Sequence, residues 1–358
     1  MANKQTAFRL TKQGAGPQGI LKVQNPIPKP GPHEVLVRIH AVTLNYRDVA
    51  LTIGRYISMT QENFVLGSDM GGEIVAVGSS ATRFKKGDRV ANTVDQRDIY
   101  NRDISQMRAS TLGGPLDGVL QEYRVFDERY LLSIPEHLSY EEASCFPGAG
   151  LTAWTTLFEG RQLVPGETVV SQGTGSVSIA ALSLAHAAGA TTIVTSSSDE
   201  KLLVPVVFSS RIGVQLAKKL GATHTINYRT TPDWDKAVNE LTKGKGANHI
   251  IDNVGISEIE RCFNCVAQGG VISNVGFLGG QPKVYPDVPM LCLLRGATMR
   301  GIYLGPVEEN ERMFRFVEQK QLRPYICKVF PFEQTVEAIQ YLESGAHFGK
   351  VVVRVSSP

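Results

Sequence analysis

The sequence is poor in cysteine, with 5 in 358 residues. A disulfide-stabilised scaffold has a higher proportion of cysteine, in an even number at regular spacing. Only Cys262 and Cys265 form a CxxC pair, and no second pair accompanies them as in a structural zinc site. Because residues 257–268 have helical spacing, we expect this pair to be buried on one face at a helix end, in a reducing compartment.

The sequence also lacks long apolar runs and an excess of either charge. No uninterrupted apolar run reaches the roughly 18 residues of a membrane-spanning helix, and the first residues lack the apolar core of a signal peptide. Lysine and arginine total 37 against 34 acidic residues, a net charge of +3 spread along the chain. The basic residues are therefore not gathered into a stripe that could bind along the phosphate backbone of a nucleic acid. We therefore expect a cytoplasmic protein that binds neither nucleic acid nor a membrane.

Two successive patterns of secondary structure are present instead. Residues 1–150 are short apolar segments separated by Gly, Pro and Asp, which is typical of a β domain. Beyond them, apolar strands alternate with helical segments, which predicts an α/β fold with a doubly wound parallel sheet. The last strand, 349–355, is expected to return to the first domain. We place the domains at 1–150, completed by about 305–358, and at 151–304.

One segment interrupts this alternation. Residues 203–215, LVPVVFSSRIGVQ, stand where an uninterrupted helix is expected, but Pro205 and the β-branched residues around it would break a helix. We interpret the segment as an insertion that forms an exposed loop.

A glycine-rich loop follows the strand around residue 170. In VVSQGTGSVSIAAL, the residues Gly173, Gly175 and Ser178 have GxGxxS spacing between a strand and a helix. Such spacing allows a tight turn, close approach of backbone to a diphosphate, and packing of the helix on the strand. The helix start then offers unpaired amides to the phosphates, which predicts a dinucleotide site that includes Ser176 and Val177. The alternative, a merely tight turn, does not account for the strands that follow.

The end of the next strand predicts which dinucleotide binds. An acidic residue there would bind a ribose diol and repel a 2′-phosphate. Here hydroxyl side chains come first, at Thr195, Ser196, Ser197 and Ser198. Lys201 can add a positive charge, whereas Asp199 argues for NAD(H) unless it caps the following helix. We predict NADP(H), with Ser197, Ser198 and Lys201 among its ligands.

Several motifs in order then resemble a known family. They are GSDMGGEIVAVG, GDRV, GLTAW, the GTGSVS loop, TSSSDEK, LGATHTINY and HFGKVVVRV. Together they resemble the medium-chain dehydrogenase/reductase superfamily, nearest to its zinc-independent quinone oxidoreductase and alcohol dehydrogenase-like branch. The resemblance implies a GroES-like β-rich catalytic domain followed by a Rossmann domain.

Zinc enzymes of this superfamily hold a catalytic metal with Cys, His and a further Cys or Asp. By the resemblance, these three positions fall on Asn45, Ser68 and Ala149, none of which binds zinc well. The cysteines of the family's structural zinc lobe would fall near residues 92–117, where the chain has none. We therefore expect no metal.

Without zinc, protein hydrogen-bond donors must polarise a carbonyl group. The resemblance puts Tyr46 beside the substrate of quinone reductases and Tyr56 at the catalytic tyrosine of enoyl-thioester reductases. Each can equally be a packing residue. Asn45 is expected to orient substrate or backbone, and Arg47 and Asp48 are interpreted as helix-start and salt-bridge groups.

The resemblance also implies further cofactor contacts. Residues expected at the nicotinamide end are Thr152, Asn253, Gly255 and Phe277. Residues expected near the adenosine phosphate are Tyr228 and Lys350. Ser176 departs from the family pattern, which has glycine there, and its side chain can either crowd the diphosphate or donate to it.

These observations lead to one functional hypothesis and two alternatives. We expect a homodimeric oxidoreductase that transfers hydride from NADPH to a small-molecule acceptor, either a quinone or the activated C=C bond of an enone or enoyl compound, without zinc. One alternative is a zinc-free alcohol or carbonyl oxidoreductase. The other is a protein that binds NADPH without turnover.

Overall fold

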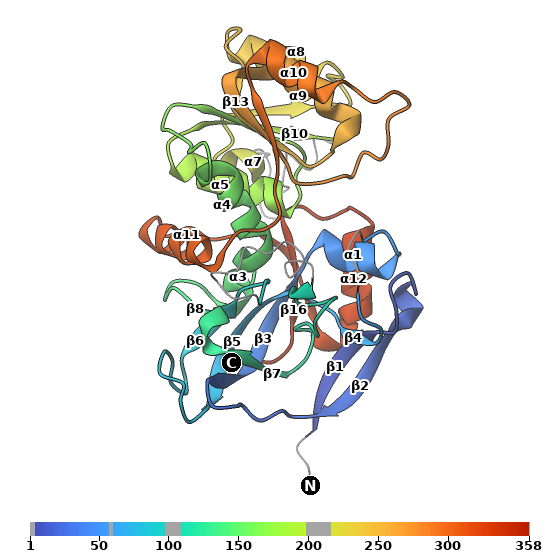
Figure 1. Cartoon of the computed structure of the whole chain (residues 1–358), viewed down its shortest axis with the longest axis vertical. Helices are drawn as coiled ribbons and strands as arrows, with labels where there is room; N and C mark the ends of the chain where they lie inside the picture. The colour runs from blue at the N-terminus through green and yellow to red at the C-terminus, as the bar shows by residue number, and fades with distance from the viewer. Residues whose placement is uncertain (1–3, 57–59, 97–108, 198–215, 358) are drawn as a thin grey trace, which may run out of the picture. The chain divides into compact units, whose positions relative to one another are not determined.

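The computed structural model describes residues 4–56, 60–96, 109–197 and 216–357 (Figure 1). The chain divides into two compact units. Unit 1 combines Met1–Leu151 with Pro306–Pro358, and unit 2 is Thr152–Gly305. The expected insertion, 203–215, lies outside the described residues, as do Ser198 and Lys201. In the described ranges, no helix is both long and apolar enough to cross a membrane.

Unit 1 is built on β-sheets. Its strands are β1 (Lys4–Leu10), β2 (Ile20–Pro26), β3 (Glu34–Leu44), β4 (Phe64–Val65), β5 (Asp69–Val77), β6 (Arg89–Asn92), β7 (Tyr123–Asp127), β8 (Leu131–Ser133), β15 (Ile326–Pro331) and β16 (Lys350–Arg354). The larger sheet has the order β15-β16-β3-β5-β6-β8, with β7 also paired to β3, and the smaller has the order β2-β1-β4. This confirms the β-rich first domain.

The C-terminal segment completes the core of unit 1. As expected from the sequence, β16 pairs with β3, antiparallel, and it also pairs with β15 in parallel. Val351, Val352 and Val353 are fully buried. Helices α11 (Val307–Gln319) and α12 (Thr335–Glu343) come from the same segment, and Ile339 and Leu342 of α12 join the core. An apolar strand with a β-branched run is thus enclosed by elements from both ends of the chain.

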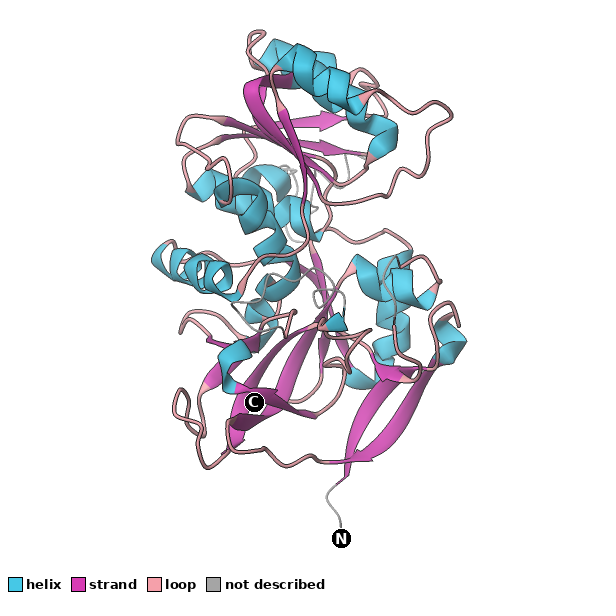
Figure 2. Cartoon of the chain, in the orientation of Figure 1, coloured by secondary structure: helices cyan, strands magenta, loops and turns pink. Residues whose placement is uncertain are grey.

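Unit 2 is a doubly wound α/β unit, as predicted. Its strands are β9 (Thr168–Ser171), β10 (Thr191–Ser196), β11 (His224–Asn227), β12 (Ala247–Asp252), β13 (Val266–Asn274) and β14 (Thr298–Gly301). All pairs are parallel, in the order β11-β10-β9-β12-β13-β14. Its helices are α4 (Leu151–Phe158), which starts at the unit boundary, α5 (Ser176–Ala187), α7 (Leu216–Lys219), α8 (Trp234–Leu241), α9 (Ile259–Cys265) and α10 (Val288–Arg295). Figures 1 and 2 show α5 on one face of this sheet and α8, α9 and α10 on the other.

The stretch 139–160, whose apolar positions in the sequence fit a single helix, is divided in the structure. It consists of α3 (Tyr140–Ala143), a π-helical turn η3 (Phe146–Gly150), and α4. Pro147 lies in the first turn of η3, where it lacks the amide that a continuing helix needs. A Cβ atom on Gly148 would lie 2.7 Å from Asp69 Oδ1, so only glycine allows the backbone this close to the carboxylate.

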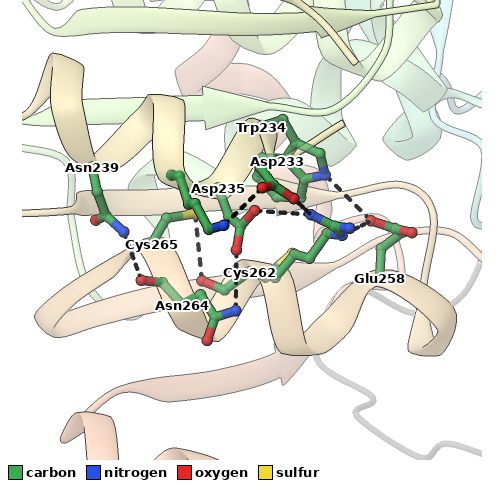
Figure 3. A network of polar contacts seen from close by, with 10 residues as sticks. Asp233, Trp234, Asp235, Asn239, Glu258, Cys262, Asn264 and Cys265 are labelled. Carbon is green, nitrogen blue, oxygen red and sulfur yellow. Dashed lines mark hydrogen bonds and ion pairs between the residues drawn. The ribbon is translucent and has the colours of Figure 1, made fainter. Parts of the chain in front are cut away.

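A polar network fastens α8 to α9 in unit 2 (Figure 3). Arg261 donates to Asp235 Oδ1 at 2.9 Å and lies 3.3 Å from Glu258 Oε2. Trp234 Nε1 donates to the same Glu258 oxygen at 3.2 Å. The thiols of Cys262 and Cys265 lie beside this network on α9, and both are fully buried and form no disulfide, as the helical spacing predicted (Figure 3).

Candidate active site

Strand β3 carries the polar segment TLNYRD at its C-terminal end. Two strands pair with β3 here: β16 places Val351 opposite Leu44, and β5 places Asp69 opposite Thr43. The next residue, Asn45, is still extended, and α1 (Tyr46–Thr52) begins directly after it. The start of β16 and the start of β5 therefore flank Asn45 from two sides.

Asn45 joins a buried cation to a buried anion. Lys350 Nζ donates to Asn45 Oδ1 at 2.8 Å, and Asn45 Nδ2 donates to Asp69 Oδ2 at 2.6 Å. Ser68 Oγ donates to the same carboxylate oxygen at 2.5 Å, and the backbone N–H of Gly148 donates to Oδ1. Asp69 is 0% exposed and Lys350 is 3% exposed. We call these four side chains, Asn45, Ser68, Asp69 and Lys350, the Asn45 cluster.

The two charges of the cluster stabilise each other. Burial raises the pKa of Asp69, while the Lys350 charge and the hydrogen bonds from Ser68 and Gly148 oppose that rise. Burial also lowers the pKa of Lys350, and the negative charge of Asp69 opposes this shift. A buried charge without a partner costs several kcal/mol, so removing either member leaves the other strongly disfavoured.

Asp48 fixes the start of α1, as predicted. Its Oδ2 accepts from the backbone N–H of Asn45 at 2.8 Å. The side chain is fully buried, and its Oδ1 has no hydrogen-bond partner in the described part of the chain. Burial raises the pKa of Asp48 to about 6. Arg47, expected in a salt bridge, instead has its guanidinium 5.2 Å from the ring centroid of Tyr56.

The residues at this place do not fit a zinc ion. Asn45 Nδ2 and Ser68 Oγ lie 3.4 Å apart, and Ala149, in η3, has no ligand atom. The nearby Cys145 thiol contacts Thr43 Oγ1 at 3.5 Å, and burial raises its pKa to about 11, so it stays protonated. Among the residues that the structure describes, no group of 3 or more His, Cys, Asp or Glu side chains could hold a metal.

The two candidate tyrosines have different surroundings. Tyr46 is the first residue of α1 and is 42% exposed. Tyr56 is half-buried and packs against the core of unit 1, and its backbone oxygen accepts from Gln13 Nε2 at 2.7 Å. Tyr46 is therefore accessible to a ligand, whereas the ring of Tyr56 has a packing contact whether or not its hydroxyl takes part in chemistry.

The glycine-rich loop in unit 2 has the shape that a diphosphate needs. Gly173 has φ +81°, a conformation that favours glycine, and α5 begins at Ser176. A Cβ atom built on Gly173 or Gly175 would meet no atom within 4 Å, so the space over the loop is open. Ser176 and Val177 are half-buried in the first turn of α5, whose N-terminal amides and positive dipole end suit phosphate oxygens. The loop therefore fits a dinucleotide.

Side chains from neighbouring strands hold this loop. Asn253 Nδ2 donates to Gln172 O at 3.1 Å and to Ser178 Oγ at 3.0 Å, and Ser178 Oγ donates to Gln172 O at 2.7 Å. The N–H of Gly173 donates to Thr195 Oγ1 at 3.2 Å. Asn253 and Thr195, considered from the sequence for direct contact with the cofactor, thus also shape the loop.

Asp252, which the sequence did not single out, fixes the neighbouring turn. Its Oδ1 accepts from the N–H groups of Val254 at 3.0 Å and Gly255 at 2.8 Å, and its Oδ2 accepts from Asn274 Nδ2 at 3.0 Å. An acidic residue directly after the apolar strand ANHII was the available signal. The predicted residue Gly255 therefore lies in a turn that Asp252 holds.

The other predicted cofactor residues are placed as follows. At the end of β10, Thr195 and Ser196 are buried, while Ser197 is half-buried and Tyr228, after β11, is 41% exposed. Thr152 is buried in α4, and Phe277 is exposed after β13. Their contacts with a cofactor remain predictions.

Lys350 lies elsewhere than expected. The resemblance suggested a position near the adenosine phosphate, but the register of β16 buries its ammonium in unit 1, against Asn45.

Comparisons with known proteins agree with this arrangement. Residues 31–136 match the family described as "Alcohol dehydrogenase GroES-like domain", and residues 176–319 match "Zinc-binding dehydrogenase". A zinc-type alcohol dehydrogenase-like protein of Schizosaccharomyces pombe is 40% identical, over 91% of this chain and 92% of its own length. The chain belongs to the medium-chain dehydrogenase/reductase superfamily.

Relatives that are named for different activities resemble this chain. A quinone oxidoreductase of Pseudomonas aeruginosa is 33% identical over 91% of this chain and 92% of its own. The crystal structure of an NAD-dependent alcohol dehydrogenase is 33% identical with a TM-score of 0.87, covering 98% of this chain and 100% of that one. The chain is thus an NAD(P)-dependent oxidoreductase, and its membership alone does not determine the acceptor or the choice between NAD and NADP.

The buried position of Asp48 predicts a specific pH dependence. Its folded pKa of about 6 exceeds its ordinary value of 3.8, so its contribution to stability is present below about pH 4 and is lost as the pH rises through 6. Between pH 8 and pH 5, the free energy of unfolding of the wild type should therefore gain about 1 kcal/mol relative to Asp48→Asn. Urea unfolding at both pH values measures this difference.

Asp88→Asn is the matched control. The pKa of Asp88 is lowered by its hydrogen bonds to Lys85, so this carboxylate stays ionised throughout that range. Its variant should follow the wild-type pH dependence. An equal change in the free energy of unfolding between pH 8 and pH 5 in the wild type and in Asp48→Asn would contradict the prediction.

Proposed function

We propose that this protein is an NADPH-dependent reductase of quinones or of activated C=C bonds in enone or enoyl compounds, and that it works without zinc. The observation that carries the proposal is the Asn45 cluster. At the positions that the resemblance assigns to zinc ligands, the chain has an amide, a hydroxyl and an alanine next to a buried ammonium. Such a site supplies hydrogen bonds and a fixed charge, and electron-poor acceptors need no stronger Lewis acid.

The residues around the end of β10 support NADPH as the reductant. Ser197 can donate to a 2′-phosphate, and β11, which pairs with β10, ends beside it. Tyr228 and Arg229 follow β11, and both are exposed. A guanidinium suits a phosphate better than a ribose diol.

The proposed reaction converts a quinone, NADPH and a proton into a hydroquinone and NADP⁺. When bound, NADPH supplies the hydride, that is, two electrons and one hydrogen. With an enone, hydride adds to the β-carbon, the electrons of the C=C bond move to the carbonyl oxygen, and a proton then adds to the α-carbon. In this scheme Asn45 and Tyr46 orient the acceptor, and Tyr56 or solvent delivers the proton.

A second candidate is a zinc-free alcohol or carbonyl oxidoreductase. It is favoured by the similarity to two relatives, a zinc-type alcohol dehydrogenase-like protein and an NAD-dependent alcohol dehydrogenase. Alcohol oxidation needs a base that takes the hydroxyl proton, however, and the Asp69 carboxylate in the Asn45 cluster is already engaged by three donors, Asn45, Ser68 and Gly148.

Turnover with chelator present tests the proposal. We expect NADPH oxidation with simple quinones or enones, unchanged after exhaustive treatment with EDTA, and NADPH binding at least about tenfold tighter than NADH, a difference of about 1.4 kcal/mol. Absorbance of the reduced cofactor measures turnover, and fluorescence titration measures both affinities. Activity only with NAD⁺ and alcohols would favour the second candidate, and loss of activity together with bound zinc would refute a zinc-free reaction. Fluorescence changes without oxidation of NADPH by any acceptor would indicate a binding protein.

Replacing each tyrosine by phenylalanine tests the two phenols. If Tyr56 delivers the proton, Tyr56→Phe should slow enone reduction about a hundredfold and quinone reduction much less, because solvent can protonate the reduced quinone oxygens. Tyr46→Phe should slow both if Tyr46 orients the acceptor. Tyr341→Phe, on α12, serves as the control and should leave the rates of enone and quinone reduction unchanged. Full turnover in the Tyr46, Tyr56 double variant would show that both phenols only pack.

We also propose that two copies of the chain form a homodimer through unit 2. Strand β14 ends the six-stranded sheet, so its outer edge pairs with no strand of the described chain. Next to β13, helix α10 exposes Leu293 at 74% and Leu294 at 72%, and Val284 and Tyr285 before it are also exposed. An open sheet edge with an adjacent apolar helix suits a second copy related by a two-fold axis.

Charged substitutions on α10 test the dimer. The double variant Leu293→Asp, Leu294→Asp should elute and sediment as a folded monomer, because a carboxylate cannot be buried in an apolar contact without a partner. Leu21→Asp, at a similarly exposed position on β2, should leave the mass unchanged. A wild type that sediments as a monomer at micromolar concentration would exclude the dimer.

A further inference from the structure

The residues of this chain depart from those of the zinc enzymes of the superfamily at one place. The resemblance assigns the zinc ligands of those enzymes to positions 45, 68 and 149, yet the residues there do not suit zinc. The cation that lies there is the ammonium of Lys350, 2.8 Å from the Asn45 amide oxygen. The chain therefore supplies a positive charge of its own at this point.

We propose that Lys350 is a positioning residue of the acceptor site: its ammonium fixes and polarises the Asn45 amide and provides the positive charge that a metal ion would otherwise place beside the acceptor. This inference rests on the proposed reduction of an acceptor. It assigns to Lys350 a role in chemistry rather than in binding of the cofactor phosphate.

The geometry of the amide carries this proposal. Lys350 donates to the amide oxygen, and this hydrogen bond draws electron density away from the amide nitrogen, so that both of its hydrogens become stronger donors. One hydrogen forms the 2.6 Å bond to Asp69. The other faces Ser68 Oγ at 3.4 Å, which is too long for a strong hydrogen bond. That weakly engaged hydrogen is the one available to an acceptor oxygen.

The charges around Lys350 keep it cationic. Three titratable groups face the Lys350 ammonium. They are the carboxyl groups of Asp69 on β5 and Asp48 on α1, and the thiol of Cys145 directly before η3. Burial raises the pKa of all three groups, but Asp69 also accepts from three donors and faces the Lys350 ammonium, which favour its carboxylate form. The cluster therefore holds one positive and one negative charge joined through Asn45, and negative charge that develops on an acceptor would be stabilised by the lysine.

Charge-removing variants test this role. Lys350→Met keeps the length of the side chain without its charge, and adding Asp69→Asn also removes the anion that Lys350→Met would leave unpaired. Both variants should lower kcat for quinones and enones at least about tenfold, with the Kd for NADPH unchanged. Lys350→Arg, which keeps the charge, should recover part of kcat. Lys328→Met, at an exposed lysine on the neighbouring strand β15, is the control and should match the wild type.

Several outcomes would overturn the inference. One is a folded charge-free variant with kcat within about threefold of the wild type, and another is a folded Lys350→Arg variant that recovers no kcat. A third is a weaker Kd for NADPH at unchanged kcat, which would instead support a phosphate ligand. If neither charge-free variant folds, the wild type decides: kcat should fall at alkaline pH together with a shift of the Asn45 side-chain amide resonance in ¹⁵N spectra. A fall without that shift would overturn the inference.

The same resonance separates this inference from the proposed function. If the wild type reduces no acceptor, the proposed function fails, but the Asn45 amide can still be observed. Lys350→Met should move this resonance and Lys328→Met should not. An unmoved Asn45 resonance would show that Lys350 does not position the amide, whatever the protein reduces.

Discussion

The antiparallel pairing of β16 with β3 is the constraint on which the candidate active site depends. It brings Lys350 beside Asn45 across a separation of 305 residues in sequence. The register is set by where the buried run ends: Val351–Val353 are fully buried, whereas Arg354 after them is exposed and donates to Glu141, and a slip by one residue would move Arg354 into a buried position. The hydrophobic core of unit 1 therefore decides where the ammonium lies.

The ammonium then determines which residues can surround it. A lysine with 3% exposure needs a nearby anion and hydrogen-bond partners, and Asp69 and Asn45 provide them. Asp69 in turn needs donors, which explains Ser68 and the close approach of the Gly148 backbone in the π-helical turn. Natural proteins keep such costly buried charges most often at functional sites, which agrees with the role inferred for Lys350.

The cofactor loop follows the same principle in unit 2. Its backbone conformation comes from two glycines, but its position comes from the carboxyl ends of three adjacent parallel strands, β10, β9 and β12. Thr195, at the end of β10, accepts from the N–H of Gly173 in the loop. Gln172, after β9, directly precedes the loop, and its backbone oxygen accepts from Ser178 and from Asn253, which follows β12. A loop held at several points needs little reorganisation when a diphosphate binds, so the binding energy is not spent on ordering it.

Local patterns were enough to predict most of the fold. The apolar periodicity predicted the parallel sheet of unit 2, the return of the last strand to the first domain, and the buried pair Cys262 and Cys265. Short or mostly exposed elements gave no clear signal, including β2, β4, β14, β15 and α10, because few buried positions give a weak pattern. The apolar positions of 139–160 indicate one helix, and although Pro147 is a local signal for a break, the contact of Gly148 with Asp69 that shapes the turn is not local.

For the site, the sequence by itself determined the chemistry of the loop, because spacing and residue type are local properties, and the family resemblance added the replacement of the zinc ligands. It named Asn45, Tyr46 and Lys350 as candidates, yet it placed Lys350 at the wrong partner. Only the tertiary structure decided that Lys350, Asn45 and Asp69 form one buried cluster, and that Asp252 holds the turn at Val254 and Gly255. The physical reason is that pairing between distant strands, set by burial of their apolar neighbours, fixes which polar groups meet.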